Sequence, residues 1–259
     1  MLKNPLTLKE RLARGEVCLG TGICFTDPAI TEALCPEFDY VWIDMEHNAL
    51  SLEAVQGHIM ATKGTNATPI VRVPWNDPVL VKPVLDIGAA GIVIPLVRTV
   101  ADVEKAVASC LYPPEGIRGF GPRRPTNYGR SGGPEFCRQA NEDMIVIVQI
   151  EHHETISNLD GILAVKGLTA VIVGPNDLAG SMGQMGSPGH PEVAVAIETV
   201  VEKCKKAGVP MGIATGDDLE AGKKWLDKGA QWLLAGTDFR HMVSGAEEIS
   251  RALRAHVGS

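Results

Sequence analysis

Charged residues stand where a buried strand should end. The stretch VWIDMEH, residues 41–47, starts as an apolar strand and then presents Asp44, Glu46 and His47 within four residues. Burying unpaired charge is costly, so a strand that turns acidic usually has something to hold. A histidine near a carboxylate is a candidate general base, and we expect Asp44 to orient His47 for proton transfer. Glu46 alternates with His47, so the two side chains should face opposite ways, which leaves the role of Glu46 open.

Two further carboxylates follow apolar runs later in the chain. Glu151 ends the run MIVIVQIE, and Asp177 comes shortly after the next run, AVIVGP. If these runs are adjacent parallel strands, their ends meet at one edge and the two carboxylates can converge on one point. Two carboxylates with waters and ligand oxygens suit Mg²⁺ or Mn²⁺. Asp177 could instead cap the helix that follows, and spacing alone leaves both readings open.

Arg72 is an isolated charge inside the apolar run PIVRV, residues 69–73. In a strand that is covered on both faces, such a charge needs a partner. The guanidinium could meet the carboxylates at the strand ends or bind an anionic substrate. The alternative is an ion pair with a purely structural role.

The elements that must position these residues are short apolar runs separated by helix-length segments. The runs are rich in Val and Ile and do not alternate cleanly with polar residues, which is typical of parallel strands covered on both faces. There are eight runs, at residues 17–24, 40–46, 69–73, 91–97, 144–151, 170–175, 210–215 and 232–237.

The intervening segments have helical spacing and helix-start signals. Ser51 is a capping residue, and Asp77 followed by Pro78 is an N-cap with proline at the first helical position. The predicted helices include residues 51–63, 77–88, 100–110, 191–208, 217–229 and 238–256. Strands alternating with helices predict an α/β fold, a (β/α)₈ TIM barrel. A doubly wound open sheet is the weaker alternative, because no G-x-G-x-x-G follows the first strand.

Composition narrows the class of protein. The chain has 259 residues and no Ser-, Pro- or Gly-rich linker, so we expect one barrel domain spanning residues 1–259. The net charge of −7 and the lack of a basic run argue against a nucleic-acid partner. No apolar run reaches the roughly 20 residues that span a bilayer, and the N-terminal stretch lacks the apolar core of a signal peptide. We therefore expect no membrane partner and a cytoplasmic location. The six cysteines are scattered along the chain, and we expect them to be reduced.

Two further features bear on the chemistry. None of the apolar runs contains a lysine. Schiff-base aldolases with barrel folds need a lysine at a strand end, so imine chemistry is disfavoured and a metal is the remaining electrophile. The segment 111–133 is long, irregular and rich in arginine, and it could cover one end of the barrel.

Several motifs occur together in a characteristic order. They are IDMEH, VRVPWND, LDIGAAGIVIP, YPPEGIRG, VQIE and VGPNDL. As a set they resemble the HpcH/HpaI family of metal-dependent (class II) pyruvate aldolases, of the 4-hydroxy-2-oxoheptanedioate aldolase type. The resemblance covers roughly residues 5–255. It implies a (β/α)₈ barrel with a C-terminal helix swapped between subunits, assembled as a homohexamer.

The resemblance also implies roles for individual residues. Glu151 and Asp177 match the ligands of a divalent metal, Mg²⁺, Mn²⁺ or Co²⁺. Arg72 matches the arginine that binds pyruvate oxygen and stabilises the enolate, and His47 matches the histidine of the acid–base step. Asp44 matches a carboxylate near that histidine. The residues that match the pyruvate pocket are Gln149, Gly174, Pro175, Asn176 and Asp177.

Asp86, in the motif LDIG, matches an aspartate that works with the histidine. The barrel topology places Asp86 near the end of a helix, at the wrong end of its own barrel. It could reach a mouth only across a subunit interface.

These matches predict reversible aldol cleavage of a 4-hydroxy-2-oxo acid to pyruvate and an aldehyde. Arg123 or Arg124 in the long loop could bind a distal carboxylate on the aldehyde half, because the guanidinium fork suits that group. The alternative for these arginines is a solvated loop. Two other functions stay open, namely a malyl- or citramalyl-type lyase acting on CoA thioesters and a non-catalytic barrel that binds a keto acid.

Overall fold

Eight parallel strands close into a barrel in the order of the sequence, with β1 hydrogen-bonded to both β2 and β8. The computed structural model describes residues 7–258. Residues 1–6 and Ser259, which the predicted domain includes, lie outside this range. The closed barrel confirms the predicted fold and excludes the open sheet. The strands are β1 Cys18–Ile23, β2 Tyr40–Asp44, β3 Thr68–Arg72, β4 Gly91–Ile94, β5 Ile145–Ile150, β6 Ala170–Val173, β7 Met211–Gly216 and β8 Trp232–Thr237.

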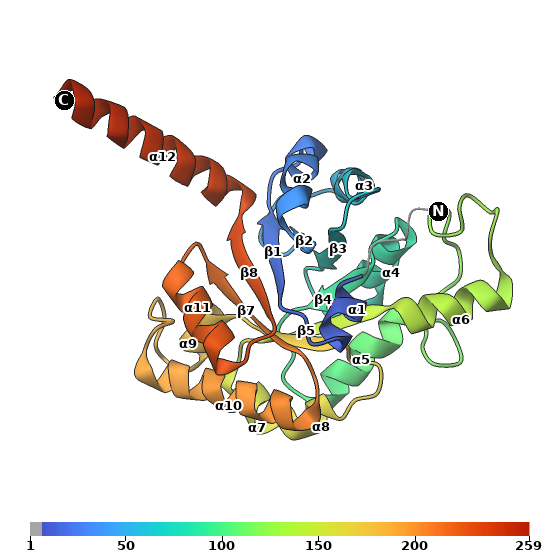
Figure 1. The fold of residues 1–259 in the computed structure, drawn as a ribbon. Coiled ribbons are helices and arrows are strands. Elements are labelled where there is room, and N and C mark those ends of the chain that lie inside the picture. Colours follow the sequence, from blue (N-terminus) through green and yellow to red (C-terminus); the bar gives the residue numbers. More distant parts are fainter. Residues whose placement is uncertain (1–6, 259) are drawn as a thin grey trace.

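Helices occupy the connections and cover the outside of the barrel (Figure 1). They are α1 Leu8–Ala13, α2 Pro28–Leu34, the 3₁₀ turn η1 Cys35–Glu37, α3 Leu52–Ala61, α4 Pro78–Asp86, α5 Val100–Cys110, α6 Gly133–Asp143, α7 His153–Ser157, α8 Leu159–Leu163, α9 Pro175–Ser181, α10 Pro191–Ala207, α11 Leu219–Lys228 and α12 Asp238–Val257. No helix in the described part of the chain combines the length and apolar character that a bilayer crossing needs.

Side-chain caps start the helices where the sequence predicted them. The Ser51 hydroxyl accepts from Ala54 N, and the Asp77 carboxylate accepts from Val79 N with proline next to it. Each cap satisfies a backbone N–H that has no partner inside the helix. The caps therefore fix where α3 and α4 begin after the loops that follow β2 and β3.

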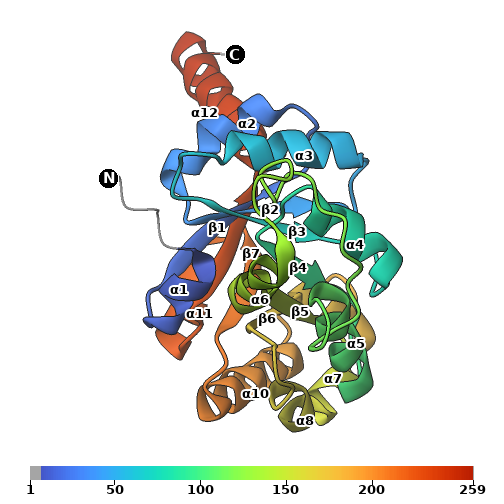
Figure 2. The same ribbon diagram turned by 90° about the vertical axis from the view of Figure 1, so that its right-hand side faces the viewer.

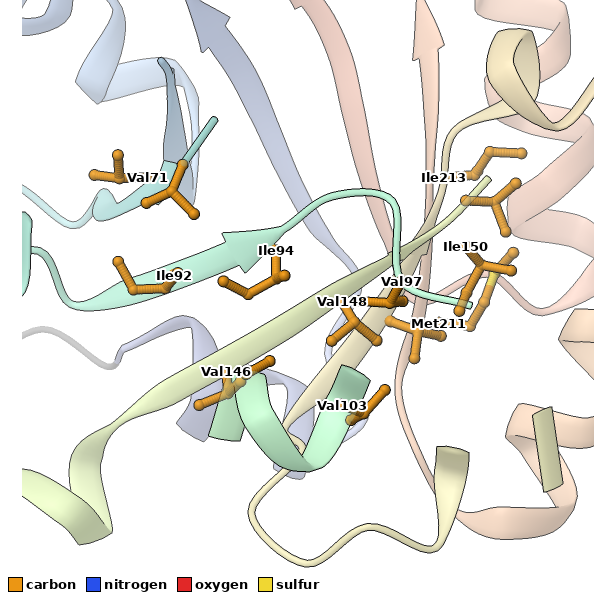
Figure 3. Packing of buried hydrophobic residues seen from close by; sticks show 14 of the residues in the cluster. Val71, Ile92, Ile94, Val97, Val103, Val146, Val148, Ile150, Met211 and Ile213 are labelled. Atoms are coloured by element: carbon orange, nitrogen blue, oxygen red, sulfur yellow. The ribbon is translucent and has the colours of Figure 1, made fainter. Parts of the chain in front are cut away.

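Two apolar clusters form the core. One fills the inside of the barrel and includes Tyr40, Trp42 and Trp232. Gly20 makes room for it, because a Cβ at this position would lie 2.2 Å from the Tyr40 ring. The larger cluster lies between the barrel and its helices, where side chains of β4, β5 and α5 meet (Figure 3). Four of the six free cysteines are buried, whereas Cys24 and Cys137 are partly exposed.

The two ends of the barrel carry different segments. The irregular segment between α5 and α6 lies at the N-terminal end of the strands, where Arg124 donates to the carbonyl of Ile87 just beyond α4. It lines a cavity there together with Pro69 and Ile145, which belong to the starts of β3 and β5. Figure 2 shows this segment passing over α4 and α6. Helix α12 leaves β8 at the C-terminal end and projects away from the barrel (Figure 1). Its exchange between subunits stays a prediction.

Candidate active site

Arg72 is the centre of a polar network at the C-terminal mouth of the barrel. It ends β3 and lies opposite Asp44, the last residue of β2, in the strand register. Its Nε donates to Asp44 Oδ1 at 2.8 Å, and its Nη1 lies 2.8 Å from Glu46 Oε2. The guanidinium also stacks over the Trp42 ring, 5.4 Å from the ring centroid. The Nη2 atom has no partner among the described residues, so it remains free to donate to a ligand.

The network continues to β5. Gln149 Oε1 lies 3.5 Å from Arg72 Nη1, and Gln149 Nε2 donates to the carboxylate of Glu151. The other Glu151 oxygen accepts from the backbone of Leu96 at 2.6 Å. Leu96 has a φ of 55°, a left-handed conformation that is uncommon outside glycine. The loop after β4 thus takes a strained shape where it directs its N–H at Glu151, as functional sites often do.

Burial and the repulsion between like charges raise the pKa values of two carboxylates at the mouth. Glu151 is only 2% exposed, and burial raises its pKa to about 7, with the charges of Glu46 and Asp177 adding to the effect. The Leu96 hydrogen bond and the Arg72 charge act in the opposite direction. Burial also raises the pKa of Glu46, which feels the charges of Asp44 and Asp177. Such crowding of oxygen ligands fits a divalent cation, whose charge would offset the repulsion.

Gly174 brings the start of α9 against this network. A Cβ at Gly174 would lie 2.8 Å from Gln149 Nε2 and 2.9 Å from Glu151 Oε2. Gly174 is the N-cap of α9, and Asp177 is the third residue of that helix. Within residues 7–258 the Asp177 side chain caps no helix, so the capping alternative for Asp177 is excluded. Glu151 and Asp177 come together at the mouth, close enough for their charges to interact.

His47 has a different partner from the predicted one. Its side chain is 63% exposed, and its Nε2 lies 3.6 Å from Glu46 Oε2. The prediction that these two side chains face opposite ways is wrong, because β2 ends at Asp44 and strand alternation does not extend beyond it. Asp44 does not orient His47 either. It accepts from Arg72 and, at 2.6 Å, from Asn48 Nδ2.

Asp86 and the loop arginines lie away from this mouth. Asp86 is the last residue of α4, at the opposite end of the barrel, as its position in the sequence predicted. It pairs with Arg118 Nη2 at 2.9 Å, and Arg118 stacks over the Tyr112 ring. Arg124 donates to Ile87 O at the same end, and Arg123 lies next to it in the chain. Within one chain, neither loop arginine can meet a substrate at the mouth, which corrects that expectation.

His152 and His153 lie at the start of helix α7. His152 is the N-cap of α7, and its ring accepts from Glu154 N. These three side chains could supply metal ligands, since their ligand atoms lie within 4.8 Å of one another. However, Arg98 lies 3.8 Å from Glu154 and would repel a cation there. The Glu151–Asp177 pair is the better fit for a metal.

The sequence and the fold both match characterised proteins. Residues 25–245 match the HpcH/HpaI aldolase/citrate lyase family. A 5-keto-4-deoxy-D-glucarate aldolase of Enterobacter sp. (strain 638) is 35% identical over 252 residues, which cover 96% of this chain and 97% of the relative.

Two solved structures extend the comparison. The HpcH/HpaI aldolase from Desulfitobacterium hafniense DCB-2 superposes with a TM-score of 0.90 at 30% identity, covering 96% of this chain and 97% of that one. The citrate lyase β subunit from M. tuberculosis, solved with oxaloacetate and magnesium, superposes with a TM-score of 0.61 at 13% identity, covering 87% and 94% of the two chains. The second likeness shows the shared fold only.

Proposed function

This chain belongs to the HpcH/HpaI aldolase family, and we propose that it cleaves 4-hydroxy-2-oxo acids reversibly to pyruvate and an aldehyde. The chain is a lyase of the class II pyruvate aldolase type, a class that depends on a divalent metal. The observation that carries the proposal is the network in which Arg72 contacts Asp44, Glu46 and Gln149 beside the buried Glu151. The absence of lysine from the strands agrees with a reaction that forms no imine.

Arg72 is the residue we propose to stabilise the reacting oxygen. Two of its nitrogens are held by Asp44 and Glu46, which fixes the direction of the guanidinium. The remaining Nη2 can donate to the 2-oxo oxygen of the substrate. When the C3–C4 bond breaks, negative charge develops on that oxygen as the pyruvate enolate forms. A donor that is already in place stabilises this charge without reorganising.

Glu151 and Asp177 are the residues we propose to hold the divalent metal. When bound, the metal supplies a positive charge that polarises the 2-oxo group. Gln149 donates to Glu151 and so keeps one carboxylate oxygen in position. The same pair of carboxylates suits Mg²⁺, Mn²⁺ or Co²⁺ by its chemistry.

His47 is the residue we propose to take the proton from the 4-hydroxyl. Its exposure leaves it free to approach a substrate, directly or through a water. Glu46, 3.6 Å away, stabilises the imidazolium that results. We propose that the substrate carboxylate accepts hydrogen bonds from the backbone N–H groups of Asn176 and Asp177. Pro175, the first residue of α9, has no N–H to offer.

Asp86 enters the proposal only through a second subunit. It lies at the far end of its own barrel, so it can act with His47 only if the mouth of one subunit faces that end of another. The homohexamer with swapped α12 helices, which the resemblance implies, would provide such a contact. In that case Arg123 and Arg124 could approach a neighbouring mouth as well.

The substrate class follows from the relatives. They act on 5-keto-4-deoxy-D-glucarate, which carries a carboxylate at each end. We propose a 4-hydroxy-2-oxo diacid of this kind as the substrate. A CoA-thioester lyase would need a basic groove near the mouth for the CoA phosphates, and the arginine-rich segment 111–133 lies at the other end of the described barrel.

A chelation experiment tests the reaction. The protein is stripped with a chelator, and pyruvate release from 4-hydroxy-2-oxo acids is measured before and after adding Mg²⁺, Mn²⁺ or Co²⁺. We expect activity to disappear with the chelator and to return with at least one ion. Activity that ignores the chelator would exclude the metal mechanism. A protein that releases no pyruvate under any condition would exclude the aldolase proposal.

A further inference from the structure

Trp42 lies directly beneath Arg72 in the interior of the barrel. In the strand register Trp42 pairs with Ile70, and two residues later Asp44 pairs with Arg72. Residues two apart in a strand face the same side, so Trp42 and Asp44 point the same way from β2, one layer apart. The guanidinium carbon of Arg72 lies 5.4 Å from the centroid of the Trp42 ring. The indole therefore forms the floor of the polar network at the mouth.

The surroundings of this contact strengthen it. Trp42 is 2% exposed, and the side chain of Arg72 is 13% exposed. The interior cluster that contains Trp42 is hydrophobic and includes Ile70, Ile147 and Ile172. The negative face of an indole attracts a cation, and the attraction grows when water is excluded. The burial of both side chains thus makes the ring a substantial partner for the charge of Arg72.

The indole N–H does not account for a tryptophan at this position. Trp42 Nε1 is buried and has no hydrogen-bond partner within residues 7–258. A buried donor without a partner lowers stability, so an apolar side chain that lacks the N–H would avoid this cost. What tryptophan adds here is its ring face, which binds a cation more strongly than the face of tyrosine or phenylalanine.

The polar partners of Arg72 hold two of its three guanidinium nitrogens. Asp44 accepts from Nε, while Glu46 and Gln149 lie against Nη1. Two points define an axis, and a planar group held at two points can still tilt about that axis. This tilt would displace Nη2, the nitrogen that is available to a ligand. The Trp42 ring lies against the face of the group and so limits the tilt.

We propose that Trp42 is a positioning residue for the reaction, because its ring holds the plane of the Arg72 guanidinium so that Nη2 meets the 2-oxo oxygen of the substrate. Trp42 touches no reacting atom and acts only through Arg72. The inference rests on the proposed aldol function and adds to it a residue outside the polar network. Charge develops on the 2-oxo oxygen as the enolate forms, so a tilted guanidinium lowers the rate more than the substrate affinity.

Trp232 provides a matched control. It is fully buried in the same interior cluster, and its Nε1 also lacks a partner in the described part of the chain. Its aromatic contact is with Tyr40, whose ring centroid lies 5.6 Å away, at the end of the barrel where β8 begins. Trp232→Leu therefore removes as much buried ring volume as Trp42→Leu, without removing a contact to Arg72.

Deuterium exchange at the methyl group of pyruvate in D₂O measures enolate formation without any aldehyde. The exchange is followed by proton NMR with Mg²⁺ present, and kcat and KM are determined for each variant. Trp42→Leu should lower kcat roughly 10-fold, as expected for the loss of a desolvated cation–π contact, and should change KM less than about 2-fold. Trp42→Phe keeps an aromatic face, so its kcat should fall only about 3-fold. Trp232→Leu should keep both constants close to those of the wild type.

A double-mutant cycle separates positioning from a general loss of packing. If Trp42 acts through Arg72, adding Trp42→Leu to Arg72→Ala should lower kcat no further than Arg72→Ala alone. A full loss in that background, or equal losses in Trp42→Leu and Trp232→Leu, would overturn the inference. If Trp42→Leu does not fold, Trp42→Phe is compared with Trp232→Phe, and equal kcat values in these two overturn it. A wild type that does not exchange would overturn the proposed function itself, and the role of Trp42 with it.

Discussion

The sequence left two roles open for Arg72, a structural ion pair and the binding of an anionic substrate. In this structure, the two roles are compatible for Arg72. Its ion pairs with Asp44 and Glu46 are structural, since they hold a charge that is largely buried. The same pairs leave Nη2 without a partner among residues 7–258, so this nitrogen is available to a ligand. The structural contacts are therefore compatible with the proposed contact between Arg72 and the substrate.

Replacing Arg72 should affect the rate more than the affinity. We expect Arg72→Ala to lower kcat by about 10²–10³-fold, the loss typical of a removed oxyanion donor, with a smaller change in KM. Arg72→Lys keeps the charge but loses the fork that Asp44 and Glu46 hold, so it should recover only part of the rate. Steady-state kinetics of pyruvate release measure both constants. If both stay close to wild type in Arg72→Ala, the assignment is wrong.

The sequence predicted which residues meet at the mouth better than how they pair. Arg72, Gln149, Glu151 and Asp177 come together because strand ends of a parallel barrel must meet. The predicted partner of His47 was wrong, because the partner depends on the shape of the bend after β2. No periodic pattern in the sequence indicates that shape. Contacts made by backbone groups were missed for the same reason, as the Leu96 N–H that binds Glu151 illustrates.

At the scale of elements, helix and strand boundaries were predicted about equally well, and a cap accounts for one helix whose limits match. The helix predicted at 100–110 has those limits, and Thr99 starts it with a capping box that includes Asp102. The strand predicted at 91–97 ends at Ile94. A cap is a local signal in a few residues, whereas the end of a strand depends on hydrogen bonds to neighbours distant in the sequence.

Helices α2 and α3 are joined by a buried histidine. His58 on α3 lies between the Thr31 hydroxyl on α2 and the carbonyl of Phe25. A carbonyl only accepts, so the neutral ring carries its proton on Nε2 and accepts from Thr31 on Nδ1. Burial lowers the pKa of His58, although the Phe25 carbonyl and the charges of Asp238 and Asp27 act against this.

Protonation of His58 should therefore lower the free energy of unfolding as the pH falls. Because the pKa is lower in the folded state, unfolded chains bind more protons, and the stabilisation is complete only above the unfolded value of about 6.5. It is lost as the pH falls from there toward the folded pKa. We expect the drop in Tm between about pH 7.5 and about pH 5.5 to be smaller in His58→Gln than in the wild type.

A second variant isolates this effect. His256 lies exposed on α12, so His256→Gln should show the same drop in Tm as the wild type. Thermal unfolding followed by circular dichroism at several pH values gives the comparison. Parallel Tm curves for the wild type and His58→Gln would contradict the role of His58.

At the scale of the whole molecule, α12 buries little of its length against its own chain, since Asp238 is its one buried residue in the described part of the chain. It projects from the barrel (Figure 1) and leaves apolar side chains in solvent. The exposed fractions are 59% for Met242, 64% for Ile249, 63% for Leu253 and 72% for Val257. The spacing of these residues places them along one side of the helix, as expected for a helix that packs on another subunit.

Charged substitutions on this side of α12 should lower the mass of the assembly. We expect the wild type to be a hexamer and the double variant Ile249→Asp with Leu253→Asp to give smaller species, because burying two carboxylates in an interface is costly. Light scattering after size exclusion measures the mass. Arg251→Asp adds an aspartate on the opposite side of the same helix and should leave the assembly intact. A double variant with wild-type mass would argue against α12 as an interface.

The groups around Arg72 and the lining of the neighbouring cavity come mostly from different strands of the barrel. The groups proposed for enolate chemistry lie on or just after β2, β3 and β5 and at the start of α9. A cavity of about 600 Å³ beside the start of α9 is lined mainly by residues of β7, β8, α10 and α11. Substitutions on the second set of elements can change the shape and charge of the cavity while the network around Arg72 stays as it is. We therefore expect the lining of this cavity to tolerate substitution more readily than the residues that contact Arg72, in the laboratory or in the course of evolution.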